Sequence, residues 1–86
     1  MRYYRARPKT NTMLVSKFLH RVEISDKEEM KRFRQGYNIK HEVMEWCREN
    51  FGQFPFDWGV YTGQPKKIVF YFLTKEDALA FKIRWS

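Results

Sequence analysis

Residues 66–77, KKIVFYFLTKED, decide the fold of this chain. Positions 68–73 are all apolar or aromatic, so a strand here is apolar on both faces and we expect it at the centre of a sheet. Thr74-Lys75-Glu76-Asp77 then predicts a helix start, because the Thr hydroxyl can accept from the backbone N–H three residues on. The helix should run from Lys75 to about Arg84. A central strand that passes directly into a helix is typical of an α+β domain.

A second strand is predicted just before the central one. Phe56, Trp58 and Val60 alternate with other residues, as the side chains on one face of a strand do. The segment Thr62-Gly63-Gln64-Pro65 is a turn. Two strands joined by a short loop that contains Gly are expected to pair as an antiparallel hairpin.

Two helices are predicted between residues 25 and 52. Ser25-Asp26-Lys27-Glu28 is a capping box with the Ser hydroxyl as the cap, and the helix it opens should run to Gln35 and end at Gly36. The next helix should begin at Asn38, a good N-cap, and end at Gly52. Its apolar residues form one stripe, which consists of Ile39, Val43, Trp46, Cys47 and Phe51.

The first strand candidate is residues 13–24, MLVSKFLHRVEI. Alternation places Phe18 with Val22 on one face, whereas Lys17 and Arg21 share the other. Residues 1–12, MRYYRARPKTNT, form a basic arm or an edge segment, and residues 13–86 form a single α+β domain. A chain of 86 residues is too short to divide into two independent cores.

These elements follow the order β-α-α-β-β-α. They predict a small antiparallel sheet of three or four strands with helices on one face, as in a ferredoxin-like or split β-α-β variant. The fourth strand would come from the basic arm or from the terminal Ile83-Arg84-Trp85. With three strands only, one face of the sheet would be bare.

The charge of the chain is uneven. The formal net charge is +7, and four bases without an acid in residues 1–9 supply +4 of it. A basic arm is attracted to polyanions, although a net charge of this size also serves solubility.

Residues for catalysis or metal binding are sparse. The chain has two histidines, one cysteine and no cluster of glycines, so we expect no metal site, no cofactor and no enzymatic activity. It shows no signal-peptide pattern and no apolar run of about 18 residues, which predicts a cytoplasmic protein without a membrane partner.

Single-stranded nucleic acid is one predicted partner. The arm interleaves Arg with Tyr, so it can pair with phosphates and stack on bases, and two lysines open the central strand. If the face of Lys17 and Arg21 is open, Tyr61 and Tyr71 should lie near it. The residues proposed for this role are Arg2, Tyr3, Tyr4, Arg5, Arg7, Lys9, Lys66 and Lys67.

Protein contact is the other predicted role. Phe54-Pro55-Phe56-Asp57-Trp58 holds three aromatic residues in five positions, and such residues are enriched in interface cores. Phe54 and Trp58 are the interface candidates; alternatively, both simply cap the helix layer. We expect a non-enzymatic binding module that acts by protein contact or as a homodimer, with single-stranded nucleic-acid binding as the alternative.

Two stretches of the sequence resemble known protein families. Residues 66–72 followed by Thr74–Ala78 resemble the third strand and second helix of the RNA-recognition-motif family, which implies that Phe70 and Phe72, or Tyr71, stack on bases. Residues 77–85, DALAFKIRW, resemble the tail of small uncharacterised proteins of tailed phages and marine metagenomes. That likeness implies a phage origin, the host cytoplasm and a joint structural role for Phe81, Lys82, Arg84 and Trp85.

Overall fold

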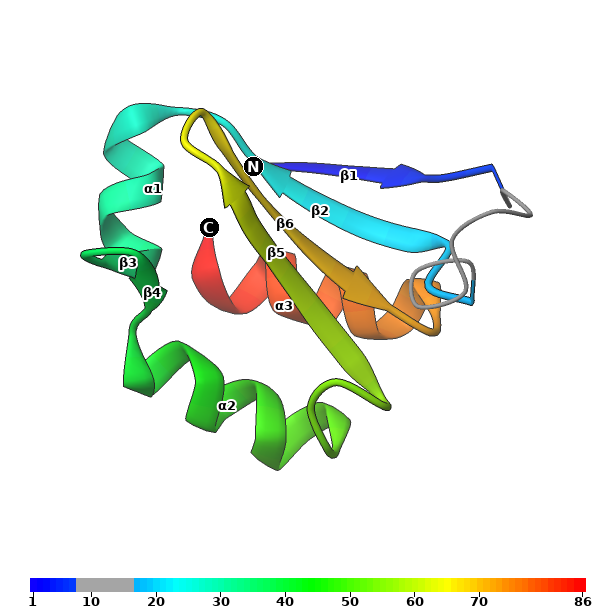
Figure 1. The fold of residues 1–86 in the computed structure, drawn as a ribbon. Coiled ribbons are helices and arrows are strands. Elements are labelled where there is room, and N and C mark those ends of the chain that lie inside the picture. The colour runs from blue at the N-terminus through cyan, green and yellow to red at the C-terminus, as the bar shows by residue number, and fades with distance from the viewer. Residues whose placement is uncertain (8–16) are drawn as a thin grey trace.

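A computed structural model describes residues 1–7 and 17–86 of the chain. It has a main sheet of four antiparallel strands in the order β1-β2-β6-β5, together with three helices (Figure 1). The predicted small α+β domain is therefore confirmed. The elements are β1 (Arg2–Arg5), β2 (His20–Ile24), α1 (Lys27–Phe33), β3 (Arg34–Gln35), β4 (Asn38–Ile39), α2 (His41–Phe51), β5 (Trp58–Gln64), β6 (Lys67–Phe72) and α3 (Lys75–Trp85).

Strand β6 occupies the centre of the sheet, as its sequence predicts. It pairs antiparallel with β2 on one side and with β5 on the other. The turn between β5 and β6 differs from the prediction, because β5 continues to Gln64 through an irregularity between Tyr61 and Gln64. The chain therefore reverses at Pro65 and Lys66, two residues later than the centre of the predicted turn.

The fourth strand comes from the N-terminal segment. Strand β1 pairs antiparallel with β2, with Tyr3 opposite Val22, whereas residues 83–85 form the last turn of α3. The predicted strand 13–24 is shorter in the structure, since β2 begins at His20. Residues 17–19 are not part of the strand, and residues 13–16 lie outside the described residues.

All three helices bring a phenylalanine to the same face of the sheet. Phe81 of α3 lies 4.4 Å from Phe70 between ring centroids, and Phe33 of α1 lies 6.0 Å from Phe70. Phe51 of α2 lies 5.1 Å from Phe72. Figure 1 shows α3 running along the sheet while α1 stands near the β5–β6 turn. We call this side the helix face, and its aromatic core supplies most of the apolar burial of the domain.

Three predicted helix ends are wrong. The cap of α1 is Asp26 rather than Ser25, and its carboxylate accepts from the backbone N–H groups of Glu28 and Glu29. Helix α1 ends before Gln35 because β3 pairs with β4, and Gly36, with a φ of 65°, forms the turn between them. A glycine at positive φ suits a hairpin turn as well as a helix end, so the sequence does not distinguish the two. Helix α2 consequently begins at His41, after β4, rather than at Asn38.

The other helix predictions are largely confirmed. Helix α2 ends at Gly52, which has a φ of 110°. The Thr74 hydroxyl caps α3 by accepting from the Asp77 N–H at 3.1 Å. On α3, however, Ile83 is exposed although it was predicted to add to the apolar surface.

The tail of α3 closes the helix layer. The Trp85 ring lies 6.0 Å from those of Phe33 and Trp46, and the Arg84 guanidinium stacks on it at 4.3 Å. The Trp85 carbonyl accepts from Arg32. Together with Phe81, these contacts anchor the end of α3 on the other two helices.

Candidate functional site

In the part of the chain that the structure describes, no helix packs on the second face of the sheet, which we call the open face. The strand register places Tyr4, Arg21, Tyr71 and Gly59 side by side across all four strands. A parallel row holds Arg2, Glu23, Val69 and Tyr61. Facing residues on paired strands share a side of the sheet, so the open face collects tyrosines and arginines from segments far apart in the sequence.

Cation–π contacts organise the first row. The Arg21 guanidinium carbon lies 5.0 Å from the centroid of the Tyr71 ring. On the edge strand, the Arg2 guanidinium carbon lies 5.1 Å from the centroid of Tyr4. A cation within about 6 Å of a ring face is attracted by the ring quadrupole. The rings of Tyr4 and Tyr71 therefore each have a positive charge beside them.

The electrostatics of Tyr71 indicate how closely the tyrosines are grouped. Burial raises the pKa of Tyr71, and the charge of Arg21 partly offsets this effect by lowering it. Tyr4 and Tyr61 each raise the same pKa further. Tyr4 and Tyr61 are therefore close enough to Tyr71 to interact with it electrostatically, and Tyr71 stays neutral at physiological pH.

The acid of the second row, Glu23, pairs with two bases. Its carboxylate forms an ion pair with Arg2 at 3.4 Å and another with Lys67 at 3.7 Å. Val69 lies between Glu23 and Tyr61 in the register and is only 3% exposed. Arg2 and Arg21 in the two rows, together with Lys67 beside Glu23, make three bases against one acid, so this part of the open face is net positive.

Glycines on either side of Tyr61 shape the edge of the open face. Gly59 and Gly63 lie two residues before and after it in the sequence. A Cβ built on Gly63 would lie 2.8 Å from the Tyr61 hydroxyl, so the phenol ring rests directly over this glycine. Tyr61 is 45% exposed. The sequence analysis did not single out these glycines, although their spacing around Tyr61 is a signal that could have found them.

A hollow of about 210 Å³ adjoins this edge. It lies over Gly59 and is bordered by two loops, one before β2 and one before β5. The loops are tied to the sheet and to each other, because Arg21 donates to the Phe18 carbonyl at 3.2 Å and Lys17 donates to the Phe56 carbonyl at 2.9 Å. The residues that line it are Phe18, Phe54, Pro55, Gly59, Val60, Tyr61 and Tyr71.

Phe18 is on the opposite side of the sheet from its prediction. The alternation placed it with Val22, which points to the helix face. In the structure its ring lies 6.4 Å from that of Tyr71, so it packs at the open face instead. The reason is that residues 17–19 do not continue the strand, and the alternation of side chains stops there.

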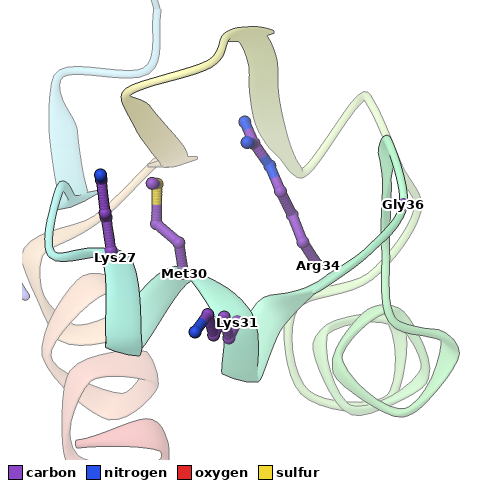
Figure 2. A pocket seen from close by; sticks show the side chains of 5 residues that line it. All are labelled: Lys27, Met30, Lys31, Arg34 and Gly36. Atoms are coloured by element: carbon purple, nitrogen blue, oxygen red, sulfur yellow. The ribbon is translucent and has the colours of Figure 1, made fainter.

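A second basic region lies at the other end of the sheet. Figure 2 shows Lys27, Met30 and Arg34 pointing toward the β5–β6 hairpin, beside a hollow of about 360 Å³ that Lys31 also lines. The Arg34 guanidinium donates to the carbonyls of residues 62, 64 and 65, so its main role is to fasten the hairpin. An adjoining hollow is lined by Lys27 and Lys66. The two lysines remain as exposed cations at this end.

Only some of the residues predicted to bind nucleic acid lie on the open face. Arg2, Tyr4 and Lys67 lie on the open face, whereas the Tyr3 hydroxyl is 2.8 Å from His20 Nδ1, in register with helix-face residues. Three further bases, Arg5, Arg7 and Lys66, are exposed but lie outside the two rows. Lys9 lies outside the described residues.

The predicted protein interface needs a correction. Trp58 is fully buried and its indole N–H donates to the Gly52 carbonyl at 3.0 Å, so it has no surface to offer a partner. Its neighbours Phe54 and Phe56 are 39% and 64% exposed. Trp58 and Val60 do share one face of β5, as the alternation predicts, but Phe56 does not join them, because β5 begins at Trp58 and Phe56 belongs to the preceding turn.

Of the stacking residues implied by the RNA-recognition-motif resemblance, only one lies on the open face. Phe70 and Phe72 have no exposed surface and belong to the core of the helix face, so they are wrong as stacking residues. Tyr71, the third candidate, lies on the open face.

The titratable residues with catalytic potential are dispersed. Burial raises the pKa of the Cys47 thiol to about 12, which leaves it protonated and unreactive. Within residues 1–7 and 17–86, no three His, Cys, Asp or Glu side chains come together as a metal site. The same residues contain no helix long and apolar enough to cross a bilayer.

Comparison with known proteins adds no relative: no family model, curated protein or solved structure matches this chain.

Proposed function

We propose that this domain binds single-stranded nucleic acid on the open face of its sheet. The observation that carries the proposal is the row formed by Tyr4, Arg21 and Tyr71 across three strands. Aromatic rings on a sheet, interleaved with bases, provide stacking surfaces for unpaired nucleobases and charges for the phosphates that link them. Of the two roles predicted from the sequence, this one is better supported by the arrangement of side chains.

The shape of the site favours a single strand over a duplex. The tyrosines lie on a sheet surface, and nothing described on this side projects as a helix would into a groove. Bases reach such a surface with their faces only when they are unpaired and splayed out. The binding should therefore tolerate many sequences, because every base has a π-face.

The charge distribution supports the same partner. The chain has a net charge of +7, and exposed bases flank the open face on β1 and at the β5–β6 turn. Phosphates that follow bases stacked on Tyr4 and Tyr71 would meet Arg2 and Arg21 beside those rings. Each neutralised phosphate releases counterions, so affinity must fall as salt rises.

A matched pair of tyrosine substitutions tests the proposal. The probe is a labelled oligothymidylate of about twelve nucleotides. Its binding is measured by fluorescence anisotropy at about 50 and 200 mM salt. Tyr71→Ala should weaken binding about tenfold, the loss expected of one stacked base. Tyr37→Ala is the control, because Tyr37 is 95% exposed in the β3–β4 turn and belongs to neither row of the open face.

Two results would refute the proposal. One is the absence of binding at the lower salt concentration. The other is an equal loss of affinity for Tyr71→Ala and Tyr37→Ala, which would mean that the open face has no special role.

A contact between protein chains is the second candidate function. The observation that favours it is the pair of exposed rings, Phe54 and Phe56, beside Pro55. If these rings form a homodimer interface, sedimentation equilibrium should give twice the monomer mass, and Phe56→Ala should restore the monomer at any salt concentration. A monomer at every protein concentration would remove the homodimer.

The finer fold assignment is also a proposal. Strands β2 and β5 both run antiparallel to β6, which lies between them, and α1 and α2 lie in the connection from β2 to β5. This arrangement supports a split β-α-β unit of the ferredoxin-like kind. The phage origin, the non-enzymatic character and the cytoplasmic location stay predictions.

A further inference from the structure

We infer that the hollow over Gly59 accepts one nucleobase of the bound strand, as a slot distinct from the stacking surface of Tyr4. The inference rests on the proposed function, and it adds where a base is enclosed and which residue makes room for it. It concerns one nucleotide only.

The missing side chain of Gly59 creates the slot. Gly59 faces Tyr71 in the register, at the end of the row of the open face. A Cβ at this position would lie 3.7 Å from the Tyr71 ring, an ordinary contact distance, so the fold does not require glycine here. Any larger side chain would occupy the space over the strand. The hollow of about 210 Å³ therefore stays open at Gly59, although the packing there would accept a side chain.

Aromatic rings enclose this volume on several sides. Tyr71 and Tyr61 border it along the sheet, Phe18 borders it from the loop before β2, and Phe54 borders it from the loop before β5. The Phe54 ring is itself supported, because its centroid lies 5.1 Å from that of the buried Trp58. A planar aromatic ligand can stack on such walls without moving them.

The loops that form the walls are held in place by cations. Lys17 Nζ lies 5.0 Å from the Phe18 ring centroid and donates to the Phe56 carbonyl, which joins the two loops. Arg21 lies over Tyr71 on the other side and donates to the Phe18 carbonyl. The slot is thus formed in the absence of ligand, and two positive charges lie at its rim.

This combination favours a nucleobase over other planar groups. Among the described residues, those that line the slot include no acid and no cation, which favours a neutral, aromatic ligand inside. The charges of Lys17 and Arg21 at the rim call for anionic groups attached to it. A base within a strand, with a phosphate on each side, has this distribution of charge, whereas the aromatic side chain of a peptide does not.

The test uses strands that differ only in their bases. One probe is an abasic strand of about twelve nucleotides, and the other is the same strand with a single thymine at its centre. The wild-type chain should bind the second probe about tenfold more tightly. Gly59→Val should abolish this gain and leave the affinity for the abasic strand unchanged, because the new side chain fills the slot without altering charge. Gln64→Val is the control, since it adds the same side chain to an exposed position of the same strand.

The outcomes separate the slot from the proposed function. If Gly59→Val keeps the full gain while Tyr4→Ala loses it, the slot is refuted and the open face still binds bases, because Tyr4 does not line the slot. If the wild-type chain does not distinguish oligothymidylate from the abasic strand, stacking itself fails and both proposals fall.

A second measurement on the wild-type chain guards against a Gly59→Val variant that does not fold. In the complex with the single-thymine strand, NMR should show contacts from the thymine to the rings of Phe18 and Phe54. Contacts to Tyr4 or Tyr61 alone would overturn the inference.

Discussion

The two faces of the sheet use alternate residues of the same strands for opposite purposes. On β6, Phe70 and Phe72 point to the helix face and are fully buried. Tyr71 between them points to the open face, where it stacks with Arg21 and remains partly exposed. One face is buried and packed with phenylalanine, whereas the other carries hydroxyl-bearing rings, two of which, Tyr4 and Tyr71, have a cation beside them.

This difference separates stability from binding. The helix face gains its free energy from apolar area removed from water, since three helices cover it with aromatic side chains. The open face gains little from such burial, and its rows of Tyr and Arg are what a polyanionic partner with aromatic bases would contact. Substitutions on the two faces should therefore change different measured quantities.

The dryness of the helix face gives the largest expected effect. Burial raises the pKa of Cys47 from 9.0 to about 12, so at about pH 8 the folded chain should hold about a thousandfold less thiolate than the unfolded chain. Alkylation by iodoacetamide should be correspondingly slow without urea and fast with it. The stability that the neutral thiol contributes is present below pH 9 and is lost as the pH rises toward 12. Rapid alkylation of the folded protein would mean that water reaches this face.

Neighbouring residues on β6 offer the most direct comparison of stability. Phe70→Ala should lower the free energy of unfolding by about 3–5 kcal/mol, because it leaves a cavity beside Phe33 and Phe81. Tyr71→Ala should cost only about 1–2 kcal/mol, since its ring is partly exposed. Urea denaturation measures both values. Equal costs would remove the distinction between the faces.

Arg34 tests how the helix layer is joined to the edge of the sheet. Its guanidinium donates to three carbonyls of the β5–β6 hairpin, at 2.9, 3.3 and 3.4 Å. Arg34→Met should lower the free energy of unfolding by about 2 kcal/mol, with little change in affinity for single strands. Lys31→Met is the control, because Lys31 is exposed and pairs only with Glu28 within its own helix. A change in affinity larger than the change in stability would place Arg34 in the binding site.

Substitution of Glu23 should have the smallest effect, and it should raise the affinity for single strands rather than lower it. Its carboxylate pairs with Arg2 and Lys67, so Glu23→Gln should leave both cations available to phosphates and raise the affinity about threefold. The free energy of unfolding should fall by at most about 1 kcal/mol. Glu42→Gln, which removes the same charge from an exposed position on α2, is the control for net charge. Equal gains for both variants would show that only the total charge matters.

The sequence predicts the helix face better than the open face. The runs at 66–77 and 39–51 are periodic, and periodicity reports which side chains are buried within one element. Whether the face of Arg21 and Tyr71 is covered depends on where the helices pack, which no local pattern encodes. The sequence therefore predicts this cluster only conditionally. It also misplaces Phe18 and Phe56, because the strands begin later than the alternation suggests.

The turns explain the remaining errors. Gly36 was predicted to end a helix, but its positive φ serves a hairpin turn equally well, and only the pairing of β3 with β4 decides between them. The cap of α1 moved by one residue to Asp26, a side chain with the same capping chemistry as Ser25. Gly59 and Gly63 matter through the space they leave, which becomes visible only when the facing strands are in place.

Chemical-shift mapping with oligothymidylate tests the central claim most directly, because it compares the two faces in one experiment. We predict that the amide resonances of Tyr4, Arg21, Tyr61 and Tyr71 shift on titration, while those of buried residues on α2 and α3 stay in place. Shifts confined to the helices, or to the hollow beside α1, would contradict the assignment of the open face as the binding surface.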